Sequence, residues 1–164
     1  MIFSFLLQLM LLTGLNSDQK TTENLKWHDF NEGIELAQKQ KKYILVDFYT
    51  DWCGWCKKMD KDTYTNPTVM QILKKNFILI KVNAEDAAKS AKYKQYNVTY
   101  PELSQGFGVT GFPATVFLNA QADYVTLVPG YLPADEMTTI LKFIHTTAFE
   151  KMTYPDFKKS LTSN

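Results

Sequence analysis

The sequence contains few of the residues that build metal centres and disulfide frameworks. Its 164 residues include two cysteines and two histidines. A structural disulfide framework needs several cysteine pairs, and a four-thiolate zinc site needs two pairs, so both are excluded. An excess of one charge is also lacking, because 18 basic residues face 17 acidic ones and leave a net charge of +1. Nucleic acid is therefore not expected as a partner, and the sequence indicates no cofactor or metal.

The most apolar stretch, residues 1–15, is too short to span a bilayer comfortably, but its length suits the core of a signal peptide. No Lys or Arg precedes the apolar run, and no Ala-x-Ala-like cleavage site follows it. We expect a signal peptide over residues 1–17 and a polar linker over 18–24, with an uncleaved anchor or a mis-set start codon as alternatives. The corresponding prediction is export to the periplasm or another extracytoplasmic compartment.

The remaining sequence predicts one compact domain over residues 25–150 and a tail over 151–164 with one short helical turn. Strands are expected over 25–27, 43–49, 77–82, 113–118 and 124–128, and helices over 29–40, 53–62, 67–75, 84–96 and 133–149, while 97–108 is less regular. Alternating strands and helices, followed by a hairpin and a closing helix, imply an α/β fold. The sheet is expected to be a central mixed β-sheet flanked by helices on both faces, in a monomer.

The two cysteines, Cys53 and Cys56, are separated by two residues and follow the apolar strand at 43–49. They therefore lie at the start of the helix expected over 53–62. Helix amides and the helix dipole favour a thiolate at Cys53, and the thiolate is the reactive form. Cys56 is close enough to form a disulfide with it. This arrangement predicts disulfide exchange.

Several segments resemble the thioredoxin superfamily and occur in the same order as in that family. Residues 46–57 resemble its active-site strand and helix, and 81–83 resemble the central strand that follows. The segment 111–115 is similar to its cis-proline loop, and Gly130 to the glycine that ends the last strand. The resemblance covers about 27–144 and implies a thioredoxin fold. Within the superfamily, the chain around Asn66-Pro67 resembles exported thioredoxin-related proteins of bacteria.

The resemblance implies a role for each of four catalytic residues. Cys53 would be the nucleophile, with a partly exposed sulfur, and Cys56 would be more buried and would resolve the mixed disulfide. Asp47 would accept the proton of the second cysteine through water, with its pKa raised by burial. Lys81 would lie near that carboxylate. Pro113 would follow a cis peptide bond.

A cis bond at Pro113 would present the Phe112 backbone beside the sulfurs, where an extended substrate could add as a strand. The residues expected to contact substrate are Trp52, Gly54, Trp55, Phe112, Pro113, Gly130 and Tyr131. Three features differ from thioredoxin itself. The first is the pair Gly54-Trp55 between the cysteines, where thioredoxin has Gly-Pro. Residues 97–108 look like an insertion, and Phe112 is bulkier than the usual residue. The first affects the reduction potential, and the other two affect the substrate range.

These inferences predict an extracytoplasmic thiol-disulfide oxidoreductase that reduces protein disulfides through Cys53 and Cys56. Its partners would be protein thiol or disulfide substrates and an upstream electron donor, for example one in the membrane. A disulfide oxidase or isomerase is the first alternative, because the sequence does not fix the reduction potential. A Cu(I)-binding module that uses the two thiolates is the second, and a scaffold without turnover is the third.

Overall fold

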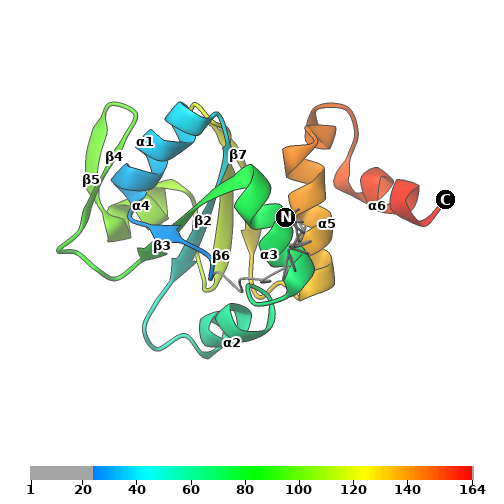
Figure 1. Ribbon diagram of the computed structural model, residues 1–164. Coiled ribbons are helices and arrows are strands. Elements are labelled where there is room, and N and C mark those ends of the chain that lie inside the picture. The colour runs from blue at the N-terminus through cyan, green and yellow to red at the C-terminus, as the bar shows by residue number, and fades with distance from the viewer. Residues whose placement is uncertain (1–23, 164) are drawn as a thin grey trace, which may run out of the picture.

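The computed structural model describes residues 24–163, and these form a five-stranded mixed sheet with helices on both faces (Figure 1). The strands are β1 (Trp27–His28), β2 (Tyr43–Tyr49), β3 (Phe77–Asn83), β6 (Ala114–Leu118) and β7 (Tyr124–Pro129). Their spatial order is β1-β3-β2-β6-β7. Strand β3 runs parallel to β1 and β2, whereas β6 is antiparallel to β2 and β7. The predicted α/β fold is confirmed.

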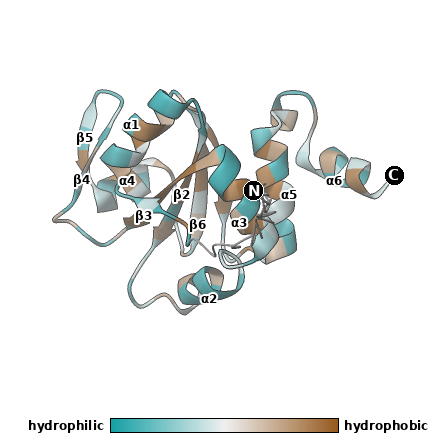
Figure 2. Ribbon diagram, viewed as in Figure 1, coloured by the Kyte–Doolittle hydropathy of each residue, from teal (hydrophilic) through white to brown (hydrophobic). Residues whose placement is uncertain are grey.

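The central strands separate two hydrophobic cores, because successive side chains of a strand point to opposite faces. In β2, Ile44, Val46 and Phe48 enter one core, and Leu45 enters the other. Figure 2 shows hydrophobic residues concentrated along these strands. Asp47 has the same parity as Leu45, so its carboxylate faces the second core.

Each core is covered by its own set of helices. The first is covered by α1 (Phe30–Gln40), α4 (Tyr100–Gly106) and the hairpin β4 (Ser90–Tyr93) and β5 (Tyr96–Thr99). The second is covered by α2 (Gly54–Asp62), α3 (Pro67–Asn76) and α5 (Ala134–His145). A 3-10 turn, η1 (Ala148–Glu150), and α6 (Tyr154–Thr162) follow, with α6 resting on α5 away from the sheet (Figure 1).

The helix predicted over 84–96 is wrong. Residues 84–89 form turns, and the chain then enters β4. Ala91 is buried and Tyr93 half-buried, whereas the lysines beside them face outward, which is the two-residue period of a strand. Lys94 has a φ of 57° in the two-residue turn to β5, as tight hairpins require. The helix-forming alanines and lysines of this segment outweighed that alternation in the sequence prediction.

Further boundaries differ from the prediction, and the edge strand expected over 25–27 is β1 at Trp27–His28. Residues 97–108, expected to be less regular, contain β5 and helix α4, which begins with a capping box between Thr99 and Glu102. The last core helix ends at His145 rather than 149. The tail forms a nine-residue helix instead of one turn, held by the Tyr154 and Phe157 rings, each 5.3 Å from the Phe143 ring.

None of the helices within residues 24–163 has the length and apolarity that a membrane crossing requires. The predicted signal peptide over 1–17, and the linker over 18–24 apart from Asn24, lie outside the described residues.

Gly33 marks the closest packing of α1 against the sheet. A Cβ at this position would lie 2.3 Å from Cγ1 of Ile80, which is fully buried in β3. We expect Gly33→Ala to destabilise the fold by about 1–3 kcal/mol, because the core must shift to admit the methyl group. Gly106→Ala is the matched control, since a Cβ there meets no atom within 4 Å. Urea unfolding measures the stability of both variants. Equal unfolding midpoints would show that Gly33 is not needed for the packing of α1 on the sheet.

Candidate active site at the Cys53–Cys56 pair

Cys53 and Cys56 form a disulfide at the N-terminus of α2, with their Cα atoms 5.3 Å apart. Cys53 is the N-cap residue, as predicted, and its sulfur accepts a hydrogen bond of 3.0 Å from the Cys56 N–H. An amide donor and the positive end of a helix dipole both favour a thiolate at Cys53 once the pair is reduced. Each residue is 4% exposed, so the predicted greater exposure of Cys53 is not found in the disulfide form.

Asp47 lies in a row of side chains that crosses three strands on the face covered by α2. It is the register partner of Lys81 in β3 and of Thr115 in β6. Asp47 is 2% exposed, and its Oδ2 lies 3.3 Å from Lys81 Nζ. Burial raises the pKa of Asp47 to about 6, helped by the Asp60 carboxylate and opposed by the Lys81 ammonium. The carboxyl group can therefore exchange a proton near neutral pH.

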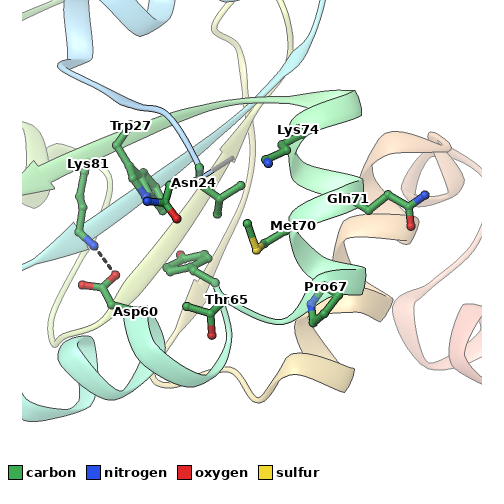
Figure 3. Close-up of a pocket in the computed structure, with 11 residues that line it drawn as sticks. Asn24, Trp27, Asp60, Thr65, Pro67, Met70, Gln71, Lys74 and Lys81 are labelled. Carbon is green, nitrogen blue, oxygen red and sulfur yellow. Dashed lines mark hydrogen bonds and ion pairs between the residues drawn. The ribbon is translucent and has the colours of Figure 1, made fainter. Parts of the chain in front are cut away.

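Lys81 connects this buried carboxylate to the surface. Its ammonium also pairs with Asp60, one turn after Cys56 on α2. It lies over the Trp27, Tyr49 and Tyr64 rings, 4.9, 5.3 and 5.9 Å from their centroids. Figure 3 shows the Lys81–Asp60 pair beside Trp27 on the wall of a cavity of about 800 Å³. Lys81 thus holds Asp47 from the side that opens to solvent.

The Phe112–Pro113 peptide bond is cis, which agrees with the resemblance to the cis-proline loop. The Pro113 carbonyl accepts a hydrogen bond of 2.8 Å from the Gly130 N–H. Gly130 has a φ of 85°, a backbone conformation that favours glycine, just after β7 ends. The loop before β6 and the end of β7 are thereby joined.

Two aromatic pairs project around the cysteines. Trp52 is 67% exposed, and its ring lies edge-on to Phe112 at 6.3 Å. Trp55 is 59% exposed and lies 5.3 Å from the ring of Tyr131. Single exposed apolar side chains are ordinary on a protein surface, whereas a contiguous apolar patch marks an interaction site. The other predicted contact residue, Gly54, is exposed at the first position of α2.

Sequence reasoning missed several residues that the fold brings to this site. Glu85 accepts hydrogen bonds of 3.0 and 3.1 Å from Trp52 Nε1 and orients that ring. Asp60, Tyr64 and Thr115 approach Asp47 or Lys81 from other elements. Only Asp60 carried a signal, because a residue four positions after Cys56 lies on the same helix face.

No group of three or more His, Cys, Asp or Glu side chains within residues 24–163 is placed to hold a metal ion. Met59 follows Cys56 by three residues and carries a thioether sulfur, which could bind a soft metal such as Cu(I). Its side chain is buried in the core with Leu45 and Leu73.

The conserved sequence pattern of the thioredoxin-like domain family matches residues 30–145. The chain belongs to this family. Haemophilus ducreyi DsbD, a thiol:disulfide interchange protein, is 31% identical over 131 residues, which cover 76% of this chain and 21% of that protein. The uncharacterized protein B0495.5 of Caenorhabditis elegans is 30% identical over 78% of this chain and 18% of its own length. The chain thus spans about a fifth of the length of the curated relatives it matches.

Solved structures agree on the thioredoxin fold. A Thermus thermophilus thioredoxin superposes with a TM-score of 0.62 at 25% identity, covering 74% of this chain and 88% of that one. The C-terminal domain of Neisseria meningitidis DsbD in its oxidised form superposes with a TM-score of 0.53 at 22% identity, covering 70% of this chain and 97% of that domain. The chain is a thioredoxin-like thiol-disulfide protein with a Cys-x-x-Cys pair.

Proposed function

We propose that this thioredoxin-like protein reduces disulfide bonds in protein substrates. The observation that carries the proposal is the Cys53–Cys56 disulfide at the start of α2, with the buried Asp47 carboxyl group in the adjoining strand. The names of the DsbD relatives, thiol:disulfide interchange proteins, support the same chemistry.

The first step is attack on the substrate. The Cys53 thiolate attacks one sulfur of a substrate disulfide, the substrate S–S bond breaks, and a mixed disulfide forms. The departing substrate sulfur leaves as a thiolate and takes a proton from solvent. The N-terminus of α2 and the Cys56 N–H favour the attacking thiolate.

The second step releases the substrate. The Cys56 thiol gives its proton to Asp47, and its sulfur attacks Cys53. The mixed disulfide breaks, the second substrate sulfur leaves as a thiolate, and the Cys53–Cys56 disulfide forms. Two electrons pass from the protein to the substrate, so a dithiol donor must reduce the pair before the next cycle.

Substrate binding would use the surface around the sulfurs. The Phe112 backbone, before the cis bond, can pair with an extended peptide as an added strand. The two aromatic pairs would contact apolar side chains of a flexible or unfolded segment. The contacts proposed for the substrate therefore include Trp52, Trp55 and Tyr131.

We propose that the protein works outside the cytoplasm, on the basis of the apolar segment at residues 1–15. Such compartments are oxidising, so the donor that reduces the cysteine pair must itself be supplied with electrons, for example through the membrane.

The test is equilibration of the purified protein with glutathione, followed by incubation of the reduced form with a disulfide-bonded protein. A potential of about −230 mV or below, with stoichiometric loss of substrate disulfides, supports a reductase. A potential of about −180 mV or above would reverse the direction and favour the oxidase or isomerase. Absence of any exchange would reject all three activities.

We expect Trp55→Ala to raise the KM for a protein substrate roughly 5- to 30-fold, the equivalent of losing about 1–2 kcal/mol of aromatic contact. Reduction of a small disulfide such as oxidised glutathione should change less, because so small and polar a molecule offers little apolar surface for the aromatic rings to contact. Tyr124→Ala is the matched control, since Tyr124 is 53% exposed but lies at the start of β7, away from the cysteines. An equal effect of both substitutions would show that Trp55 does not bind substrate.

A further inference from the structure

Four buried side-chain oxygen atoms of the described residues have no hydrogen-bond partner. One, Oγ1 of Thr50, follows the end of β2. The other three are Oδ1 of Asp47, the hydroxyl oxygen of Tyr64 and Oγ1 of Thr115. Buried polar groups in proteins are almost always hydrogen-bonded, because an unpaired one loses its contacts with water and gains nothing. Three such atoms in one region therefore call for a common explanation.

The three atoms belong to one place in the fold. Thr115 and Asp47 are register partners, so their side chains leave β6 and β2 on the same face. Tyr64 lies just after α2, which covers that face, and its ring packs edge-on to Trp27 at 4.9 Å. Burial, and then the Asp47 carboxylate, raise the pKa of the Tyr64 hydroxyl, whereas the Thr115 hydroxyl lowers it. The two hydroxyls are therefore close enough to interact, although neither meets hydrogen-bond geometry with the other.

The two oxygens of Asp47 thus face different partners. Oδ2 is held by Lys81, which in turn pairs with Asp60 at the edge of the cavity. Oδ1 has no partner, and the side chains of Tyr64 and Thr115 that approach Asp47 each carry an unpaired hydroxyl. A hydroxyl can donate one hydrogen bond and still accept, whereas an ionised carboxylate can only accept. The hydroxyl groups of Tyr64 and Thr115 can therefore supply the hydrogen-bond donors that the Asp47 carboxylate lacks.

We propose that Tyr64 and Thr115 are positioning residues for the proton transfer from Cys56 to Asp47. Their hydroxyls and Asp47 Oδ1 form one buried polar site that holds a water molecule, which accepts from the hydroxyls and donates to the carboxylate. One water making about three hydrogen bonds is typical of such sites. The inference rests on the proposed function, because it concerns the step in which Cys56 loses its proton.

The proton balance of this step is simple. The S–H bond of Cys56 breaks, its proton moves to Asp47, and the electron pair stays on the sulfur that attacks Cys53. Donated hydrogen bonds stabilise the ionised carboxylate, which is the form that can accept the proton. The other charged or titratable groups that face Asp47 are Lys81 of β3, Asp60 of α2 and Tyr49 of β2.

The test is the titration of Asp47 in the reduced protein, followed by the NMR shift of its carboxyl carbon. Tyr64→Phe removes one hydroxyl and should move the midpoint upward by about 0.5–1 pH unit. The pH profile of the single-turnover release step should move by the same amount. Thr115→Val should act in the same direction, whereas Thr115→Ser keeps the hydroxyl and should restore the wild-type midpoint.

Tyr100→Phe is the matched control. Tyr100 is equally buried, but its hydroxyl accepts a hydrogen bond of 3.3 Å from the Phe30 N–H in the other core. This variant should leave the Asp47 midpoint unchanged. Folded Tyr64→Phe and Thr115→Val proteins with the wild-type midpoint would overturn the proposal. The titration needs no substrate, so this failure is distinct from a wild-type protein that exchanges no disulfides, which would reject the function instead.

Discussion

Cys53→Ser is expected to lower protein-disulfide reduction by more than about 10³-fold, to the background rate. The thiolate is the nucleophile in thiol–disulfide exchange, and a serine hydroxyl does not ionise near neutral pH. Cys53 has the position that stabilises a thiolate, because it caps α2 and accepts a hydrogen bond from the Cys56 N–H. The measurement is the loss of substrate disulfides under single-turnover conditions, by thiol titration.

Cys56→Ser is the matched control, because it makes the same replacement of sulfur by oxygen one helical turn further along α2. This variant keeps the Cys53 thiolate, so it should attack substrate once and then stop. The product would be a mixed disulfide between Cys53 and the substrate, visible as a covalent complex by mass spectrometry. If Cys53→Ser instead formed the covalent complex through Cys56, the assigned order of attack would be reversed.

The sequence is sufficient to predict the strand and helix that carry the cysteines. An apolar run ends at Tyr49, and the helix starts at the cysteines, so local patterns determine the geometry of the pair. The cis bond at Pro113 could be predicted only through resemblance, because most X-Pro bonds are trans. The sequence predicts a helix where β4 lies because the alanines and lysines of 84–92 have good helix propensity, while packing against α1 and α4 decides the conformation of the hairpin at 90–99.

The environment of Asp47 is a different case, since it depends on residues far apart in sequence. Lys81 and Thr115 reach Asp47 only through strand pairing, and Tyr64 reaches it only because the chain after α2 turns back over the sheet. No spacing rule connects these positions. A sequence can therefore indicate that a buried carboxylate is functional without indicating which groups set its proton affinity.

The buried Asp47 carboxylate lowers the free energy of unfolding when it is ionised, and a substitution can measure by how much. The pKa of Asp47 is raised from 3.8 to about 6 in the folded protein. The folded state therefore binds this proton more tightly than the unfolded state, and its contribution to stability is fully present below about pH 4. The contribution is lost as the pH rises to about 6 and stays lost above that. A shift of roughly 2 pH units corresponds to about 3 kcal/mol.

We therefore expect Asp47→Asn to stabilise the oxidised protein by up to about 3 kcal/mol at pH 8, and to remove this part of the slope between pH 4 and 6. Lys81 keeps its pairing with Asp60 in the variant. The same change should slow release of the mixed disulfide by about 10²-fold, because an amide cannot accept the Cys56 proton. Stability and catalysis would thus move in opposite directions, as expected for a functional buried charge.

Urea unfolding across this pH range measures the first effect, and single-turnover kinetics measure the second. Asp62→Asn is the matched control: Asp62 lies on α2 and pairs with Lys58 at the surface, where an ion pair contributes little to stability. The Lys58 side chain lowers the pKa of Asp62, so this substitution should not stabilise the protein at pH 8. An Asp47→Asn protein with the wild-type pH slope and the wild-type release rate would show that the Asp47 carboxyl group neither holds the proton nor transfers it.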